Sequence, residues 1–353
     1  MILALLMTAV GCSKGDIKQS SDTSAPVSET AITVDTSAPQ QQENSLASRH
    51  VRNVDAPANG DIVILMTGDT HSWFNKGFTY AGVYEVRYQM ELKGDTVILV
   101  DDGDAIQGSP AGLNDKGEMI IDFMNAMEYD VAIPGVHEFH YGMDRFFEIR
   151  KKAKFEYICS NFQKDGQPVL KPYVIKEVCG KKVAFVGVTT PKALTQLPLE
   201  YFQDETGKVV YDFLQDETGD AIVKAVQDSI NKARAEGAQY VIVMGHIGKE
   251  ALAEPWTYEF ITTRLTGCDA YLDGYSHEIK TEEYIDATGV KRLRLSAGTA
   301  MRGLAWLRIS SVDGEITGGV HQWQNKISPY ELFDFENPIS KMTEAAKKAL
   351  GIE

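Results

Sequence analysis

Five apolar segments of this chain each end in side chains that can bind a metal ion. They read ILMTGDTH, ILVDDGDAIQG, VAIPGVHEFH, VIVMGHIG and YLDGYSH, and they hold five of the seven histidines in the sequence. A short buried strand that ends at Asp or His presents that side chain at the carboxyl edge of a sheet, where open α/β folds bind ligands. Chance scatter does not collect histidines in this way, so the sequence predicts a metal-centred site at such an edge. The candidate ligands are Asp69, His71, Asp104, His137, His140, His246 and His277.

Strand-like and helical patterns alternate from Asp61 onward. Apolar runs typical of buried strands cover 61–68, 95–102, 130–135, 155–162, 181–190, 239–246, 269–275, 291–298 and 304–311. Helical spacing of apolar residues predicts helices over 117–127, 219–237 and 338–350. Strands without polar alternation, separated by helices, indicate an α/β protein whose sheets are covered on both faces.

The charge balance excludes one class of partner. Fifty acidic residues face 35 basic ones, which gives a formal charge of −15. A protein that binds a nucleic acid polymer needs a basic face, so we expect no such partner. The hydrophobic content of 43% over 353 residues is enough for one large α/β domain.

The N-terminal segment predicts a lipid anchor. Residues 1–12 form an apolar run, too short to span a bilayer, that ends in Ala9-Val10-Gly11-Cys12. This end resembles the lipobox of a bacterial lipoprotein signal, in which Cys12 is acylated after cleavage. The alternative is a frayed hydrophobic N-terminus. The lipoprotein interpretation places the protein at the bacterial cell surface or on a periplasm-facing membrane, outside the cytoplasm.

The remaining chain divides into three parts. Residues 13–58 are rich in Ser, Thr, Pro and Gln and contain little to bury, so we expect a disordered tether. Residues 59–330 carry the α/β pattern, and 331–353 are expected to form a linker-like C-terminal helix. Cys159 and Cys179 lie in apolar runs and are expected to be small core residues.

The order of the motifs resembles the 5′-nucleotidase branch of the calcineurin-like metallophosphoesterases over about residues 61–326. That family has a D-x-H motif, a GDxxQG motif, a GNHEFDYG motif, a lone GH and a final GHSH. The matching segments here are Gly68–His71, Gly103–Gly108, Gly135–Gly142, Gly245-His246 and Gly274–His277. The resemblance implies a four-layer α/β/β/α sandwich with two mixed β-sheets.

The resemblance also implies a phosphoesterase with divalent metal ions such as Zn, Mn or Mg. In this chemistry two adjacent cations polarise the phosphoryl oxygens and lower the pKa of a bridging water that attacks phosphorus in line. The family pattern assigns the first site to Asp69, His71, Asp104 and His277, and that set is complete in this chain. Asp104 stands where the family's bridging, catalytic Asp stands.

The second metal site departs from the family pattern. Asp104 and His246 are present, but Val136 replaces the family's Asn and Tyr275 replaces a His. Val has no donor atom, and Tyr is a poor ligand for zinc or manganese, although its phenolate can bind trivalent iron. Tyr275 could instead only fill the space of a missing ion.

A third departure adjoins the second site. The family pairs a His that contacts the phosphate or protonates the leaving group with an Asp that orients it. Here the catalytic candidate His137 is kept, and His140 replaces its partner Asp. His140 as a substitute metal ligand is an alternative. Because all three departures fall in one corner, we expect one tight metal site and reduced activity.

Two functions remain open from the sequence. The first is a surface-anchored hydrolase of phosphomonoesters or cyclic nucleotides, with a small phosphorylated molecule as its substrate. The second is a non-catalytic relative that binds a metal, a phosphate or a partner protein. Full-length 5′-nucleotidases carry a C-terminal domain that stacks on the nucleobase. The sequence here ends at Glu353, so such a domain would be a separate partner.

Overall fold

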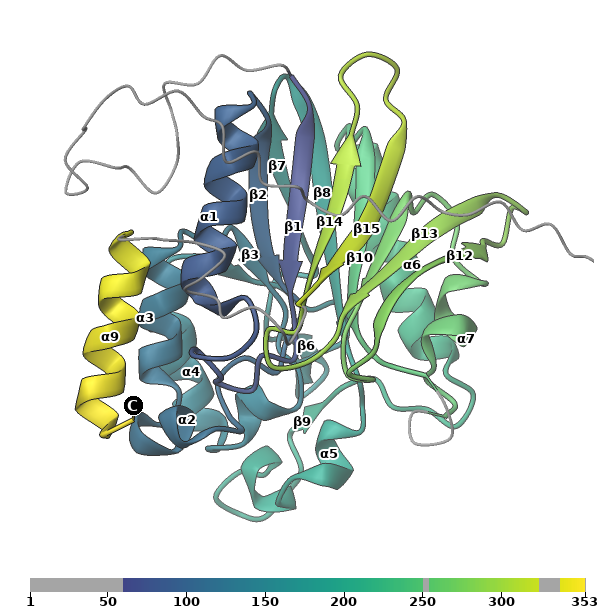
Figure 1. The fold of residues 1–353 in the computed structure, drawn as a ribbon. Helices are drawn as coiled ribbons and strands as arrows, with labels where there is room; N and C mark the ends of the chain where they lie inside the picture. Colours follow the sequence, from purple (N-terminus) through teal and green to yellow (C-terminus); the bar gives the residue numbers. More distant parts are fainter. Residues whose placement is uncertain (1–59, 250–253, 324–336, 353) are drawn as a thin grey trace, which may run out of the picture. The chain divides into compact units, whose positions relative to one another are not determined.

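Two mixed β-sheets form the centre of the fold. The computed structural model describes residues 60–249, 254–323 and 337–352 (Figure 1). The first sheet has the order β15-β14-β1-β2-β3-β4, and the second has the order β12-β13-β11-β10-β8-β7. In the first sheet, β1, β2, β3 and β4 are neighbours in that order and pair in parallel. In the second sheet, β8, β10, β11 and β13 do the same. The strands β14, β15, β7 and β12 pair with their neighbours antiparallel.

The strands of the first sheet are β1 (Ile62–Thr67), β2 (Thr96–Asp101), β3 (Val131–Ala132), β4 (Glu156–Tyr157), β14 (Gly303–Ile309) and β15 (Ile316–Gln322). Those of the second are β7 (Tyr173–Val178), β8 (Lys181–Thr189), β10 (Tyr240–His246), β11 (Ala270–Asp273), β12 (Ile279–Ile285) and β13 (Lys291–Ala297). A small third sheet contains β5 (Gln163–Lys164), β6 (Gln167–Pro168) and β9 (Tyr211–Asp212).

Helices cover the outer face of each large sheet (Figure 1). On the first sheet they are α1 (Thr79–Leu92), α2 (Pro110–Asp115), α3 (Glu118–Ala126), α4 (Met143–Lys152) and α9 (Pro338–Leu350). On the second they are α6 (Asp220–Ala235) and α7 (Tyr258–Thr262). Three short elements lie near the carboxyl edge: η2 (His137–Phe139), α5 (Ala193–Gln196) and η3 (Leu199–Phe202).

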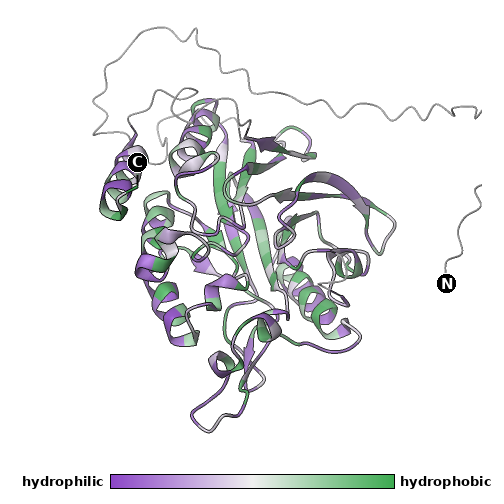
Figure 2. Ribbon diagram, turned by 60° about the horizontal axis from the view of Figure 1, so that its bottom comes forward, coloured by the Kyte–Doolittle hydropathy of each residue, from purple (hydrophilic) through white to green (hydrophobic). Residues whose placement is uncertain are grey.

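Three apolar clusters define four layers. The middle cluster combines residues of both sheets, such as Ile64 and Val100 from one and Phe185 and Met244 from the other. The alternate residues of the strands point outward and pack against the helices on either side. Figure 2 shows the result, with hydrophobic strands in the interior and hydrophilic faces on the outer helices. The predicted four-layer sandwich is therefore confirmed.

The C-terminal helix is part of the domain's packing. Asn337 caps α9 by accepting hydrogen bonds from the backbone N–H groups of Ile339 and Ser340. The helix contacts α1 and α3, and the side chains of Ile339 and Ala346 are buried in the same apolar cluster as the first sheet. The predicted helix over 338–350 is confirmed.

Some expected features differ from the structure. Only two residues pair as strands in each of the runs 130–135 and 155–162. Cys159 is buried as expected, but Cys179 is exposed, which corrects its assignment to the core. Cys179 lies at the turn between β7 and β8, where its φ of 49° allows the chain to reverse.

Cys12 and the boundaries predicted at residues 12, 58 and 330 lie outside the described residues. Within the described ranges, no helix is both long and apolar enough to cross a membrane.

Candidate metal centre

The carboxyl ends of the parallel strands bring the five ligand-bearing loops together. Thr67 of β1 pairs with Asp101 of β2, so the loops that follow these strands begin side by side. In the second sheet, Gly245 of β10 pairs with Asp273 of β11, just before the loop that leads to His277. The sequence therefore places its Asp and His residues at one edge because parallel strands end in register there.

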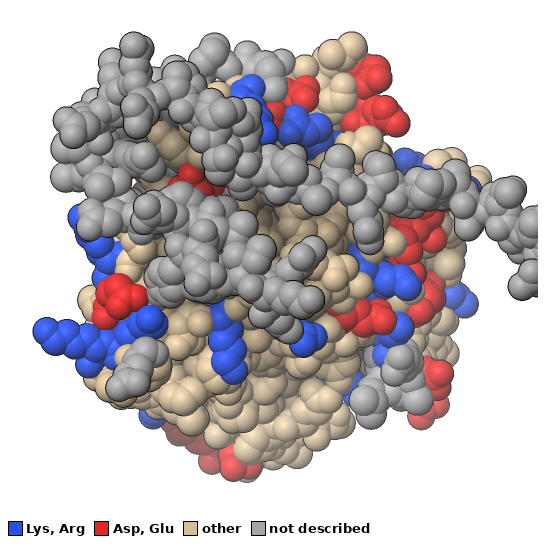
Figure 3. Space-filling view, viewed as in Figure 1, with Lys and Arg blue, Asp and Glu red and all other residues tan. Residues whose placement is uncertain are grey.

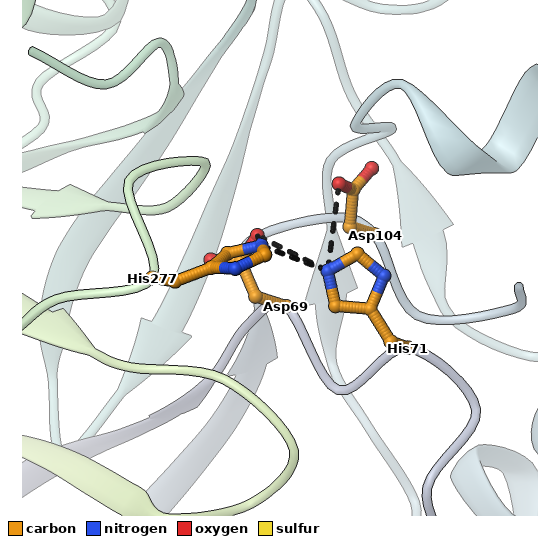
Figure 4. Close-up of side chains that lie close together, drawn as sticks. All are labelled: Asp69, His71, Asp104 and His277. Carbon is orange, nitrogen blue, oxygen red and sulfur yellow. Dashed lines mark hydrogen bonds and ion pairs between the residues drawn. The ribbon is translucent and has the colours of Figure 1, made fainter. Parts of the chain in front are cut away.

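Four of the predicted ligands form one cluster. Asp69, His71, Asp104 and His277 each offer one ligand atom, and these four atoms all lie within 4.8 Å of one another (Figure 4). The closest approach joins the Nε2 atoms of His71 and His277 at 2.9 Å. Oδ1 of Asp69 lies 3.4 Å from His277 Nε2 and 4.0 Å from His71 Nε2. The four residues come from three loops, so the fold, not local sequence, assembles the cluster.

The backbone is strained at every residue of this cluster. The φ angles of Asp69, His71, Asp104 and His277 are 49°, 47°, 56° and 56°. A residue with a side chain seldom adopts this left-handed region, and such strain persists only where the surroundings enforce it, typically at functional sites.

Backbone groups orient both the imidazoles and the carboxylates. His71 Nδ1 lies 3.1 Å from the carbonyl oxygen of Gln107, and His246 Nδ1 lies 2.7 Å from that of Asp102. In the neutral form of each ring these contacts favour a hydrogen on Nδ1, which leaves the electron pair of Nε2 directed toward the cluster. The backbone N–H of Tyr275 donates to the Asp69 carboxylate at 3.0 and 3.2 Å.

Asp104 is the electrostatic centre of the site. Burial opposes its ionisation, but His246, His137 and His71 outweigh that effect and hold the pKa of Asp104 below its usual range. His246 Nε2 lies 3.2 Å from Asp104 Oδ2. Although burial alone would lower the pKa of His246, the carboxylates around it raise that pKa well above its usual value.

The donor set fits a divalent cation. The two carboxylates are hard ligands and the two imidazoles are borderline ligands, and this combination suits Zn, Mn or Mg. Copper(I) and iron–sulfur clusters prefer sulfur ligands, which this set does not contain. The carboxylates of Asp69 and Asp104 are almost fully buried, and a buried carboxylate needs a compensating positive charge. The hydrogen bond that the His277 ring donates to the Asp69 carboxylate raises the pKa of His277, so a proton competes with a metal at that ring.

The corner that the family pattern gives to a second cation contains Val136 and Tyr275. Val136 is buried in the apolar cluster of the first sheet, and Tyr275 packs against the same cluster. The Tyr275 ring meets the His246 ring edge to face, with 5.6 Å between centroids. Burial raises the pKa of the Tyr275 phenol. His246 lies outside the group of four, beside Asp104.

His137 and His140 stack at the rim of the site. Their rings are 5.4 Å apart and inclined by 21°, and His137 Nε2 lies 3.8 Å from Asp104 Oδ2. Burial lowers the pKa of both rings, and the positive charge that neighbouring histidines can carry lowers it further. His140 therefore stacks on His137 where the family pattern has a carboxylate that would attract its proton.

Glu138 is a buried acidic residue that is not among the site residues predicted from the sequence. Its carboxylate accepts hydrogen bonds from the backbone N–H groups of Asp104, Ala105 and Gly135 at 2.9, 2.7 and 2.6 Å. It thus ties the loop after β2 to the loop after β3. Burial and the Asp104 charge raise the pKa of Glu138 to about 7. The sequence signal that could have identified Glu138 is an acidic residue inside the segment VHEF, which begins with an apolar residue and ends with an aromatic one.

The visible protein surface carries mixed charge. Lys and Arg side chains are interspersed with Asp and Glu on the face seen in Figure 3.

Comparisons with known proteins agree with this geometry. Residues 62–290 match the family described as calcineurin-like phosphoesterase. Over 255 residues the chain is 31% identical to a 2′,3′-cyclic-nucleotide 2′-phosphodiesterase/3′-nucleotidase of Haemophilus influenzae, covering 62% of this chain and 36% of that protein. The chain spans 36% to 41% of the length of the first three curated relatives that it matches, and less of several others.

Solved structures share the fold. A 5′-nucleotidase precursor from Thermus thermophilus aligns with a TM-score of 0.66 at 18% identity, over 82% of this chain and 59% of that one. The calcineurin-like phosphoesterase YfkN from Bacillus subtilis aligns with a TM-score of 0.61 at 21% identity, over 82% of this chain and 97% of that one. At these identities the likeness shows the arrangement of the sheets and helices.

Proposed function

The chain belongs to the calcineurin-like phosphoesterase family, as its motifs predicted, and we propose that it hydrolyses phosphate esters with one tightly bound divalent cation. The observation that carries this proposal is the cluster of Asp69, His71, Asp104 and His277, whose ligand atoms lie within 4.8 Å of one another. These residues are the complete first-site set of the family pattern, at the edge of the fold where ligands bind.

The residues around the cluster have distinct roles in this proposal. A bound cation would polarise the phosphoryl group and make a water molecule more acidic. Asp104 supplies negative charge at the centre of the site, and His246 balances part of that charge. His137, at the rim, contacts the phosphoryl group or gives a proton to the leaving oxygen, because its ring is partly exposed and 3.8 Å from Asp104.

Reduced turnover is part of the proposal. Val136 and Tyr275 occupy the positions of two second-site ligands, so the second cation is absent or weakly held. Each electrostatic contribution of this kind is typically worth about two to three decades of rate. We therefore expect a slower enzyme than a relative with both sites complete.

The substrate class follows from the relatives. Those named above act, by their names, on 2′,3′-cyclic nucleotides and on 3′- or 5′-nucleotides. We propose a nucleotide or another small phosphate ester as the substrate here. Lipid attachment at Cys12 would hold the domain on the outer side of a membrane, which suits an enzyme that takes nucleotides from outside the cytoplasm.

A second candidate function is binding of a metal or phosphate without turnover. The observations that favour it are Val136, which offers no donor atom, and His140, which replaces an orienting carboxylate. Both changes weaken catalysis more than they weaken the first metal site.

Turnover measurements separate the two functions. The full chain, loaded with manganese or zinc, is assayed with 4-nitrophenyl phosphate, bis(4-nitrophenyl) phosphate, and 2′,3′-cyclic, 3′- and 5′-nucleotides. We expect metal-dependent hydrolysis that Asp104→Asn abolishes and that His321→Ala, on β15, leaves intact. Metal binding without hydrolysis of any of these esters would establish the second function instead.

A further inference from the structure

Tyr275 is held rigidly in the corner where the family pattern has a metal-binding His. Its φ of 74° lies in the left-handed region, which is strained for a bulky residue. The ring lies edge on to His246, and a Cβ at Gly248 would collide with Tyr275 Cδ1. Only glycine fits there, so the ring has little freedom to move. A strained and tightly packed aromatic residue beside the metal cluster indicates a function beyond filling space.

The hydroxyl group of Tyr275 keeps its own hydrogen available. Gln196 Nε2 donates a hydrogen bond to the Tyr275 oxygen at 2.7 Å. Because the phenol oxygen is the acceptor in this contact, the phenol hydrogen is not used by it. Among the residues that the structure describes, no acceptor for that hydrogen is present. A phenol is protonated at neutral pH, so Tyr275 can donate to a ligand.

Gln196 comes from a segment that contacts two of the loops at the site. Gln196 ends α5, and η3 follows it in the chain. Tyr201 of η3 lies beside Gly142, where a Cβ would be 3.8 Å from Tyr201 Cδ1. The α5–η3 segment (Ala193–Phe202) thus reaches from the loop of Tyr275 to the loop of His140. It adjoins both loops that depart from the family pattern.

We propose that Tyr275, positioned by Gln196, donates its phenol hydrogen to a non-bridging oxygen of the substrate's phosphoryl group. The proposal rests on the phosphoesterase function proposed above and names the donor that acts in the corner of the missing second cation. Negative charge on the non-bridging oxygens is what a cation there would stabilise. A fixed neutral donor supplies part of that stabilisation without needing metal ligands.

The test compares Tyr275→Phe with the native full chain, both loaded with manganese. Binding of inorganic phosphate is measured by calorimetry, and kcat/KM is measured for phenyl phosphate and 4-nitrophenyl phosphate. We expect phosphate affinity and kcat/KM to fall by about tenfold to a hundredfold, as for loss of a hydrogen bond to a charged group. The fall should be equal for the two esters, because a non-bridging oxygen is not part of the leaving group.

Two further variants separate positioning from general damage. Gln196→Ala keeps the phenol of Tyr275 but removes the hydrogen bond that positions it. We therefore expect phosphate affinity to fall less than it does in Tyr275→Phe. Tyr240→Phe also removes a phenol hydroxyl, but Tyr240 begins β10, at the end of the strand opposite to His246. We expect this variant to keep the phosphate affinity and kcat/KM of the native chain. Metal content and thermal stability should be the same in all of these proteins.

Three results would overturn the inference. Unchanged phosphate affinity in Tyr275→Phe would remove the contact, and a loss of metal in that variant would make Tyr275 a ligand. A fall that is larger for phenyl phosphate would assign the hydrogen to the leaving oxygen. If no ester is hydrolysed but phosphate binding still needs the Tyr275 hydroxyl, the proposed function fails and the phosphate contact stands.

Discussion

The Nε2 atoms of His71 and His277 lie 2.9 Å apart, although 206 positions separate the two residues in the sequence. Both nitrogens point into a space bordered by the carboxylates of Asp69 and Asp104. Two imidazoles can face each other only if a proton or a cation lies between their electron pairs. The two buried carboxylates favour the cation, because they need its charge.

We therefore expect about one tightly bound divalent ion per chain. His277→Ala removes one of four ligands, and the loss should exceed the roughly tenfold to hundredfold that removal of a ligand's hydrogen-bond partner costs. Elemental analysis after dialysis measures the metal content. His321→Ala serves as the matched control, because His321 lies on β15, outside the cluster. Two stoichiometric ions per native chain after exhaustive dialysis would contradict the single-site prediction.

Metal affinity should rise with pH through the imidazole range. The hydrogen bond that the His277 ring donates to the Asp69 carboxylate raises the pKa of His277, so below that pKa the ring carries a proton that must leave before a metal binds. Above it the ring is neutral and the competition ends. Each proton released makes the affinity rise about tenfold per pH unit. A chelator competition titration between about pH 5.5 and 8 measures this slope.

The His277→Ala variant provides the comparison for this titration. It lacks the competing ring, so its slope should be smaller by about one proton. An identical slope in the variant would mean that His277 does not exchange its proton for the metal.

Glu138→Gln should destabilise the fold. The Glu138 carboxylate accepts three backbone N–H groups, whereas the amide of Gln presents one oxygen and an NH₂ group that cannot accept. A buried donor left without a partner costs about 1–3 kcal/mol. Urea unfolding measures the loss. Glu148→Gln on the exposed face of α4 is the control and should change stability by less than about 0.5 kcal/mol. Equal stability of the two variants would refute the role given to Glu138.

Cys12→Ser should release the protein from the membrane fraction or block its processing in bacteria. Cys12 is the predicted lipid attachment site, and without the acyl chains the tether would have no anchor. Cell fractionation measures the distribution. Cys179→Ser changes an exposed cysteine of the folded domain and should leave the distribution as in the native protein. If Cys12→Ser stays in the membrane fraction unchanged, lipidation at this residue is wrong.

The sequence predicted the metal cluster because apolar runs ending in Asp or His define both a strand and the edge at which it ends. Asp69 and His71 could be placed without knowing the partner strand, since parallel strands share one carboxyl edge. The strands β7, β12 and β15 could not be predicted from the sequence, because their partly exposed residues interrupt the apolar run that is typical of a buried strand. The contact of Gln196 with Tyr275 joins residues 79 positions apart, which no local pattern encodes.

The final prediction concerns the three departures from the family pattern. Val136→Asn, His140→Asp and Tyr275→His together restore the missing second-site ligands and the carboxylate beside His137. We expect the triple variant to bind a second cation and to turn over phosphate esters faster than the native chain by about two decades, because the second cation again stabilises the transition state.

The three substitutions should act as one unit. Val136→Asn alone offers one ligand while Tyr275 still occupies the other position, so it should raise the rate little. Tyr275→His alone removes the phenol donor before a second cation can replace it, so its rate should fall. The sum of the single effects should therefore fall well short of the triple effect, as for residues that serve one constellation. Metal content and kcat/KM of the three single variants and the triple variant test this non-additivity. A native chain that already matches the triple variant would show that its second site was never lost, with Tyr275 or His140 acting as a ligand.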